Sequence, residues 1–293
     1  MRESLDISVV IVSWNVEDLL RRCLFSILSQ GGVSFDIHVV DNASSDGSVA
    51  MVKKEFPAVQ CIENVQNVGF ATANNQVLPA VRGRHVLLLN PDTQLPGDVL
   101  RKTVAYLDAH HDVGIVGCTI LHDDGRLQRS VLRFPTLVSQ ALVLLKLQAL
   151  TLKPKVLQRY YALDFNYQKE QDVDQVMGAF FAVNGDVIRQ VGLLDGQYFA
   201  WFEEVDYCKR AQRAGWKIRY TPSFSITHTG GQSLSQLLSI EQQVIFNRSM
   251  IHYFRKHHSF LAAGILLVLA IPSLLFALAE NIIRHWYVPK AVR

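Results

Sequence analysis

The chain has 293 residues, 49% of them hydrophobic, so it can bury a sizeable core, and wholesale disorder is excluded. Its 29 basic and 26 acidic residues give a net charge of +3, and from Arg248 onward six Lys and Arg residues face one acid, Glu280, a balance of +5. The first 247 residues are therefore at −2, and a domain without a basic field is not expected to bind nucleic acid.

The first part of the chain alternates apolar runs with helical patterns. We expect strands over 7–12, 36–40, 59–63, 85–89 and 113–118, and helices over 16–30, 48–56, 70–81 and 97–110. This alternation predicts βαβ units and a mostly parallel sheet that binds ligands beyond the carboxyl ends of its strands. Further on, the expected elements are a helix over 137–152, a strand over 175–183, a helix over 203–214 and a strand over 217–220.

The cysteines and the N-terminus indicate in which cellular compartment the large domain lies. Cys23, Cys61, Cys118 and Cys208 lie far apart, without a CxxC pair or metal-ligand spacing, so we expect reduced core thiols in a cytosolic domain. The first residues lack the basic start, apolar stretch and cleavage site of a signal peptide. We therefore expect the large domain to stay in the cytoplasm.

Polar loops follow two of the predicted strands. Asp41 could accept a hydrogen bond from an imide N–H such as N3 of uracil or thymine, or it could merely cap the next helix together with Asp46. Asp92 could hold Mg²⁺ or Mn²⁺ against a diphosphate, or Pro91 could simply begin a turn. Near Asn67 and Gly69, a helix start with amide side chains such as Asn75 suits phosphate or ribose, although such a pattern also makes ordinary loops.

An acidic cluster stands beside aromatic residues later in the chain. Glu203, Glu204 and Asp206 fall within four residues, next to Trp201. At a helix start these acids would favour the helix dipole, which is a purely structural role. Like charges and apolar neighbours also raise the pKa of a carboxyl group, which suits a general base. His228 ends a strand-like segment before two glycines and gains interest from Asp92 and this cluster.

Together these segments resemble the family 2 glycosyltransferases, and most closely their rhamnosyltransferase-like branch, which elongates lipid-linked bacterial surface polysaccharides. The matching segments occur in family order: VVIVSWN (9–15), DNASSDGS (41–48), NVGFATANN (67–75), LLLNPDT (87–93), GAFFAVNGDVI (178–188) and LLDGQYFAWFEEVDYCKRAQRAGWKIRYTPSFSITHTGG (193–231). The resemblance implies a GT-A fold, an α/β domain with a Rossmann-like, mostly parallel sheet between flanking helices.

The resemblance also implies a role for each candidate residue. Donor binding would involve Ser13, Asp41, Asn67, Gly69, Asn75 and Asp92, with Asp41 on the nucleobase. Asp92 and His228 would hold the metal, Mg²⁺ or Mn²⁺, that bridges the diphosphate. Glu204 would be the catalytic base of a single inverting displacement, and the acceptor side would hold Trp201, Glu203 and Asp206.

This sequence departs from the family pattern at two positions. Asn90 replaces the first Asp of the family's Asp-x-Asp motif, as is usual in this branch, which leaves fewer charges on the metal. Position 204 is Glu where many relatives have Asp, so the base reaches about one methylene further. Both departures leave metal affinity and the identity of the base open.

The C-terminal part contains an uncharged run of 20 residues, 260–279, which as a helix would be about 30 Å long. We expect a catalytic domain over 1–232, a helical connector with a basic end over 233–258, a membrane-associated or transmembrane helix over 259–280 and a basic tail over 281–293. Pro272 could break this helix, and a buried helix or an interfacial hairpin is the alternative. The predicted helix over 137–152 could add a membrane contact or belong to the core.

These observations combine into one expected function. The chain would be an inverting, metal-dependent glycosyltransferase on the cytoplasmic face of the inner (plasma) membrane. It would move a sugar, with L-rhamnose as the first choice, from a nucleoside-diphosphate donor to a hydroxyl of a lipid-linked saccharide acceptor. The competing interpretations are a nucleotidyltransferase of related fold and a catalytically silent membrane scaffold.

Overall fold

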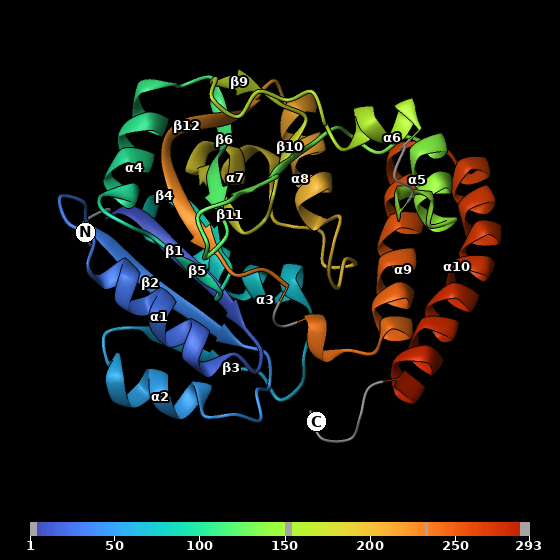
Figure 1. Ribbon diagram of the computed structural model, residues 1–293. Coiled ribbons are helices and arrows are strands. Elements are labelled where there is room, and N and C mark those ends of the chain that lie inside the picture. The colour runs from blue at the N-terminus through green and yellow to red at the C-terminus, as the bar shows by residue number, and fades with distance from the viewer. Residues whose placement is uncertain (1–4, 150–153, 232–233, 288–293) are drawn as a thin grey trace.

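The computed structural model describes residues 5–149, 154–231 and 234–287 and shows an α/β domain with a helical hairpin beside it (Figure 1). Its main sheet has the strand order β3-β2-β1-β4-β11-β6-β12-β5, with β7 beside β6 and β9 beside β12. The strands are β1 (Leu5–Ser13), β2 (Phe35–Asp41), β3 (Gln60–Glu63), β4 (Gly83–Leu89), β5 (Thr93–Gln94), β6 (Val113–Leu121), β7 (Leu127–Gln128), β9 (Gln171–Asp172), β11 (Phe180–Asn184) and β12 (Lys217–His228).

The sheet is mostly parallel, as expected, with the antiparallel strand β11 inserted between β4 and β6. Strands β1 to β4 pair in parallel, as the βαβ pattern predicts, but β11 runs antiparallel to both β4 and β6. The expected strand over 175–183 is two strands: β10 (Gln175–Val176) pairs with β8 (Val131–Leu132) in a separate ribbon, and β11 begins at Phe180. An apolar run indicates a buried strand but does not encode the direction of its neighbours.

Helices cover both faces of the sheet. One layer is α1 (Glu17–Leu28), α2 (Ser48–Glu55) and α4 (Val99–Ala109), and the other is α3 (Phe70–Val77), α7 (Gly185–Val191) and α8 (Glu203–Arg213). Strand β1 shows why two cores form: Ile7 and Val9 join the first core while Val10 joins the second. Side chains alternate along a strand, so a continuous apolar run supplies both faces.

A third core joins the domain to the C-terminal helices α9 (Ser239–His257) and α10 (Phe260–Tyr287). Phe202 and Val205 at the start of α8 pack there against Tyr253 and Phe254 of α9 and Leu266 of α10. The hairpin is therefore part of the packed structure rather than a separate tail.

Several elements differ from the sequence-based expectation. The helix expected over 137–152 ends as α5 (Leu137–Leu144), because the backbone turns at Lys146 with φ of 58° before a 3-10 turn, Leu147–Ala149. Residues 150–152 lie outside the described part of the chain. Helix α6 (Lys155–Tyr160) follows, and neither it nor α7 is among the predicted elements.

The C-terminal helix is longer than expected. Helix α10 runs through Pro272 and continues past residue 280 to Tyr287. The expected tail lies partly within this helix, and its last residues, 288–293, fall outside the described part of the chain. Of the cysteines, all four are free; Cys61 is only partly buried, and the other three belong to the core.

Candidate active site

A cleft of about 1060 Å³ opens beyond the carboxyl ends of β1, β2 and β4. This is the edge of the sheet where the loops of the βαβ units converge. Its walls include Ser13, Asn42, Asn67 and Gly69 at one end and Asn90, Asp92, His228, Trp201, Glu203 and Glu204 at the other. The fold thus brings together segments separated by up to 215 residues of sequence.

Asp41, the last residue of β2, is buried next to the cleft residue Asn42 and is not itself one of the residues that line the cleft. It pairs with Ser13 in the register of β1 and β2, and Oδ1 accepts a hydrogen bond of 2.8 Å from the Ser44 backbone N–H. The buried Oδ2 receives no hydrogen bond from any described residue. Asp46, in contrast, accepts from the backbone N–H groups of Ser48 and Glu17. Of the two, Asp46 uses both carboxylate oxygens on backbone N–H groups, whereas one oxygen of Asp41 has no partner among the described residues.

Gly69 permits a close approach that no other residue would allow. Its φ is +81°, and an added Cβ would lie 2.5 Å from the carbonyl oxygen of Phe199. Its N–H donates to the side chain of Asn67, and the next N–H, that of Phe70, donates to Phe199 at 2.7 Å. This contact joins the loop of Asn67 and Gly69 to the segment that leads into Trp201.

Asn75 is not at the cleft. Its side-chain Nδ2 donates to the Leu194 carbonyl at 2.8 Å, and its Oδ1 accepts from the Leu194 N–H at 3.1 Å. Both halves of the amide are therefore used to hold the loop before α8. A helical pattern places Asn75 on α3 but does not tell which side of the helix faces the ligand, so the expectation of donor binding fails here.

Asp92 and His228 face each other across the cleft end of the sheet. His228 Nε2 lies 3.2 Å from Asp92 Oδ1, and Asp92 Oδ2 accepts from the Gly230 N–H. Two ligands at right angles, each about 2.1 Å from Mg²⁺, are about 3 Å apart, so this pair fits two positions of an octahedral ion. Within the described residues no third His, Cys, Asp or Glu joins them. A diphosphate and water would complete such a shell.

Gln128 orients His228, and no motif in the sequence indicates this role. Its Oε1 lies 3.0 Å from His228 Nδ1, and when Nδ1–H donates to it, Nε2 carries the lone pair that faces Asp92. Fixing the tautomer through the other ring nitrogen is how proteins prepare a histidine for a metal. Gln128 lies on the short strand β7, paired to β6, and only this pairing brings it to His228.

The acidic pair enters the cleft from a strained turn. Trp201 and Phe202 both have left-handed backbone conformations, with φ of 61° and 68°, which are rare for bulky residues. Helix α8 begins immediately afterwards, and Glu203 and Glu204 line the cleft. In each of them Oε2 is buried and receives no hydrogen bond from the described part of the protein.

Burial shifts the titration of both groups. It raises the pKa of Glu204 to about 6 and, together with the neighbouring charge of Glu204, raises the pKa of Glu203 well above its ordinary value. A carboxyl group that titrates near 6 is a stronger proton acceptor than an ordinary glutamate and is still ionised at neutral pH. This pair can therefore exchange a proton with a bound hydroxyl.

Asp206 is not on the acceptor side. It is fully buried and contacts Arg210 at 2.8 Å, Lys256 at 2.8 Å and His257 at 2.6 Å. Burial alone would raise the pKa of Asp206, but hydrogen bonds from His257 and Lys256 and the charge of Arg210 lower it. Residues two apart point to different sides of a helix, so Asp206 faces α9 whereas Glu204 faces the cleft.

Comparisons with known proteins identify the family of this chain. The family described as "Glycosyltransferase like family 2" matches residues 5–242. An N-acetylglucosaminyl-diphospho-decaprenol L-rhamnosyltransferase of Mycobacterium tuberculosis is 26% identical over 239 residues, 75% of each chain.

Two solved structures share the fold. The mannosyltransferase PcManGT from Pyrobaculum calidifontis, in complex with GDP-Man and Mn²⁺, has a TM-score of 0.60 and 17% identity over 98% of this chain and 77% of its own. TarS 1-349 of S. aureus with UDP-GlcNAc has a TM-score of 0.54 and 15% identity over 98% and 74%. With the family match over most of its length and the GT-A fold, the chain belongs to glycosyltransferase family 2 and is a glycosyltransferase.

Proposed function

We propose that the protein transfers a sugar from a nucleoside-diphosphate donor to a hydroxyl group, with inversion at the anomeric carbon. The observation that carries this proposal is one cleft holding an unpartnered carboxyl pair, Glu203 and Glu204, and a facing Asp92–His228 pair. Asp41, buried beside the cleft at the end of β2 with one oxygen that has no partner among the described residues, would accept the imide N–H of a thymine or uracil base.

Each residue would contribute one step. Ser13, Asn67 and Gly69 would hold the nucleoside, and Asp92 and His228 would hold Mg²⁺ or Mn²⁺. When bound, the ion supplies positive charge for the diphosphate that leaves. Glu204 would accept the acceptor hydroxyl proton while that oxygen bonds to the anomeric carbon and the bond from this carbon to the diphosphate oxygen breaks. Trp201 and Glu203 would position the acceptor.

L-rhamnose, carried by dTDP, is the first choice of donor sugar. The M. tuberculosis relative is a rhamnosyltransferase by name and acts on a diphospho-decaprenol saccharide. A lipid-linked acceptor also agrees with helix α10, in which Phe260–Ala279 is the one stretch of the described chain long and apolar enough to cross a membrane. We infer a site of action on the cytoplasmic face of the membrane, where nucleotide sugars are made, in the synthesis of a surface polysaccharide.

The test is release of a nucleoside diphosphate from a panel of nucleotide sugars, with Mg²⁺, Mn²⁺ or a chelator. We expect dTDP release from dTDP-rhamnose that needs a divalent ion and a saccharide-lipid acceptor. Asp92→Asn should lose the metal-dependent part, whereas Asp124→Asn, an exposed acid paired with Arg126, should not. Release from another nucleotide sugar alone would replace the rhamnose assignment, and equal activity with and without the chelator would contradict the metal role.

A further inference from the structure

The hairpin of α9 and α10 is closed along its whole length (Figure 1). At one end the Ser239 N–H donates to Asn281 Oδ1 at 3.0 Å, and in the middle the buried Asn247 amide donates to Ser273 Oγ at 3.1 Å. At the other end a turn at His258 joins the helices. The two helices therefore run antiparallel, side by side, from the first turn of α9 to the last described part of α10.

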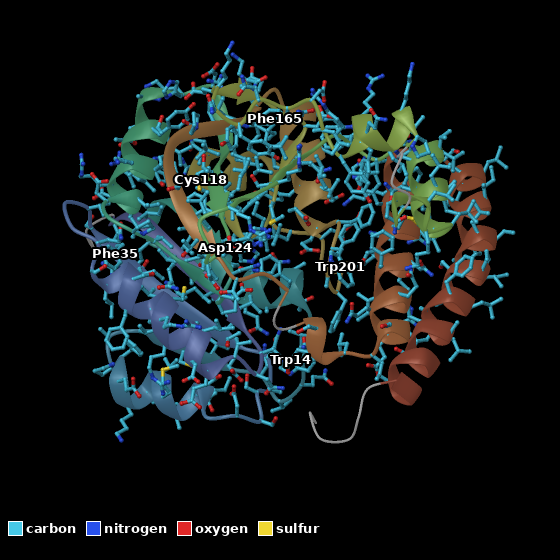
Figure 2. All side chains as sticks on the ribbon, in the orientation of Figure 1. Trp14, Phe35, Cys118, Asp124, Phe165 and Trp201 are labelled. Atoms are coloured by element: carbon cyan, nitrogen blue, oxygen red, sulfur yellow. The ribbon has the colours of Figure 1, made fainter. Side chains whose placement is uncertain are left out.

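Helix α9 is fixed to the catalytic domain by polar contacts, two of them at buried side chains, Ser249 and His257. Ser249 Oγ donates to the Ala200 carbonyl at 2.8 Å, Lys256 pairs with Asp195 at 2.7 Å, and His257 contacts Asp206 at 2.6 Å. Trp201, a cleft residue, packs edge-on against Phe246 of α9, and Figure 2 shows it between the sheet and this helix. The orientation of α10 is consequently set by the domain itself.

Helix α10 has one buried and one exposed apolar face. Its inner face is made of small side chains and one leucine, buried against α9 and α5: Ala262, Ala263, Leu266, Ala270 and Ala277. The outer face is exposed to solvent: Val268 is 64% exposed, and Ile271 and Leu275 are each 61% exposed. Exposed Val138 and Leu145, on α5 and at its end, add to this apolar surface beside α10.

This geometry does not allow α10 to cross a bilayer while the hairpin stays closed. Helix α9 would be carried into the hydrocarbon with it, and Arg248, next to the Asn247–Ser273 contact midway along α10, would cost about 2.5–3.5 kcal/mol as a charge near the bilayer centre. Opening the hairpin would instead remove the hydrogen-bond partner of the Asn247 amide and expose the apolar side chains of the third core. If α10 lies parallel to the membrane surface, the charges of α9 stay outside the hydrocarbon and the hairpin stays closed.

We propose that α10 lies in the plane of the membrane interface, with its outer face among the acyl chains, and that it does not span the bilayer. The partner is a bilayer with anionic headgroups, because the flanking elements offer exposed cations: Lys155 and Arg159 on α6, and Arg248 and Arg255 on α9. An apolar stripe flanked by basic residues is the pattern of interfacial helices.

What this membrane position implies for the acceptor rests on the proposed function and adds to it the side from which the acceptor reaches the cleft. Tyr161 and Leu163, which follow α6, line the same cleft as Glu204, and Trp201 joins that cleft to α9. The membrane-facing surface and the acceptor wall are thus built from neighbouring segments. A lipid-linked saccharide whose lipid lies among the acyl chains next to α10 would reach the cleft from this side.

The first experiment labels single cysteines with an impermeant maleimide in inside-out and right-side-out membrane vesicles. In a Cys61→Ser background, Ser259→Cys and Asn281→Cys flank the two ends of the apolar stretch of α10, and Ser29→Cys, directly after α1, marks the side of the catalytic domain. We expect both ends to react from the same side as Ser29→Cys. Reaction of the two ends from opposite sides would overturn the in-plane position. In the membrane-bound protein the pair Asn247→Cys and Ser273→Cys should also crosslink, and a crosslink seen only in detergent would contradict a closed hairpin.

The second experiment measures binding to liposomes of phosphatidylcholine with or without phosphatidylglycerol. Replacing both Ile271 and Leu275 by Glu should lower the bound fraction more than tenfold, and phosphatidylglycerol should increase binding of the parent protein. The matched control replaces Phe25 and Leu28, which are 57% and 45% exposed on α1, by Glu and should bind as the parent does. Equal loss in both variants, or no binding by the parent, would overturn the proposal.

These outcomes are independent of sugar transfer. If both ends of α10 label from the domain side but no nucleotide sugar is turned over, the proposed function fails and the membrane position stands. If sugar is transferred while the ends label from opposite sides, the membrane position fails and the proposed function stands.

Discussion

Helix α8 carries acidic residues on two sides, and they differ in their partners and in the direction in which their pKa values are shifted. On the cleft side, Glu203 and Glu204 have buried oxygens without a partner among the described residues, and their pKa values are raised. On the α9 side, Asp206 is buried with three basic side chains around it, and its pKa is lowered. The four-residue stretch therefore holds a pair that can exchange a proton, Glu203 and Glu204, and one acid, Asp206, that keeps its charge.

The contrast shows what a carboxylate needs for each task. An acid surrounded by cations remains ionised and holds two elements together, here α8 and α9. An acid in a cleft without cations titrates close to neutrality and can act as a base. The four predictions below test this contrast at α8 and its counterpart at the donor end, Asp41 and Asp46.

The largest effect is expected for the paired acid. Asp206→Asn removes a charge from among Arg210, Lys256 and His257, and loss of one partner from a buried ion pair costs about 3–5 kcal/mol of unfolding free energy. Denaturant unfolding measures it, with Asp112→Asn as a control, because Asp112 pairs with Lys217 at the surface, where such a change costs less than about 1 kcal/mol. Equal losses in the two variants would show that the Asp206 cluster does not hold α9.

The next effect concerns catalysis by the unpartnered acid. Glu204→Gln should lower kcat by about 10²-fold or more and leave the donor Kd nearly unchanged, since the variant keeps the shape of the side chain and loses only proton transfer. Glu203→Gln is the matched control and should lose less. A variant Glu204→Gln with near-parental kcat would show that another group is the base, and the larger loss in Glu203→Gln would assign it.

A similar contrast at the donor end should give a smaller effect. Asp41→Ala should raise the Kd of the nucleoside diphosphate about tenfold or more, because a hydrogen bond to a charged group contributes about 1.5–3 kcal/mol. Asp46→Ala should leave this Kd unchanged and cost about 1 kcal/mol of stability, as expected for loss of a capping side chain. Calorimetric titration with dTDP and UDP measures the first, and thermal unfolding measures the second.

The smallest effect is the pH dependence of turnover. Glu204 must be deprotonated to act, so kcat should be full above its pKa of about 6 and fall about tenfold for each pH unit below it. Between the ordinary value of 4.5 and about 6 the folded protein holds the extra proton, so the contribution of Glu204 to stability decreases as the pH rises through this window. A kcat profile from pH 4.5 to 8 checks this, and a limb near 4.5 would contradict the raised pKa.

The sequence alone determined the alternating βαβ part of the fold and the loops of its ligand-binding edge. Strands that run in parallel end at the same edge, so placing Asp41 and Asp92 after two such strands already predicts that they share a site. The family resemblance added His228 and Glu204, which the structure places at the same cleft. Apolar periodicity also located the C-terminal helix.

Tertiary structure decided what periodicity does not encode, namely which partner each face meets. It set the direction of β11, turned Asn75 toward Leu194 and Asp206 toward α9, and brought Gln128 to His228. For α10, twenty apolar residues satisfy equally the requirements of a span and of an interfacial helix. The long contact of α10 with the charged helix α9 favours the interfacial helix over the span, because moving the charges of α9 into the bilayer would cost free energy.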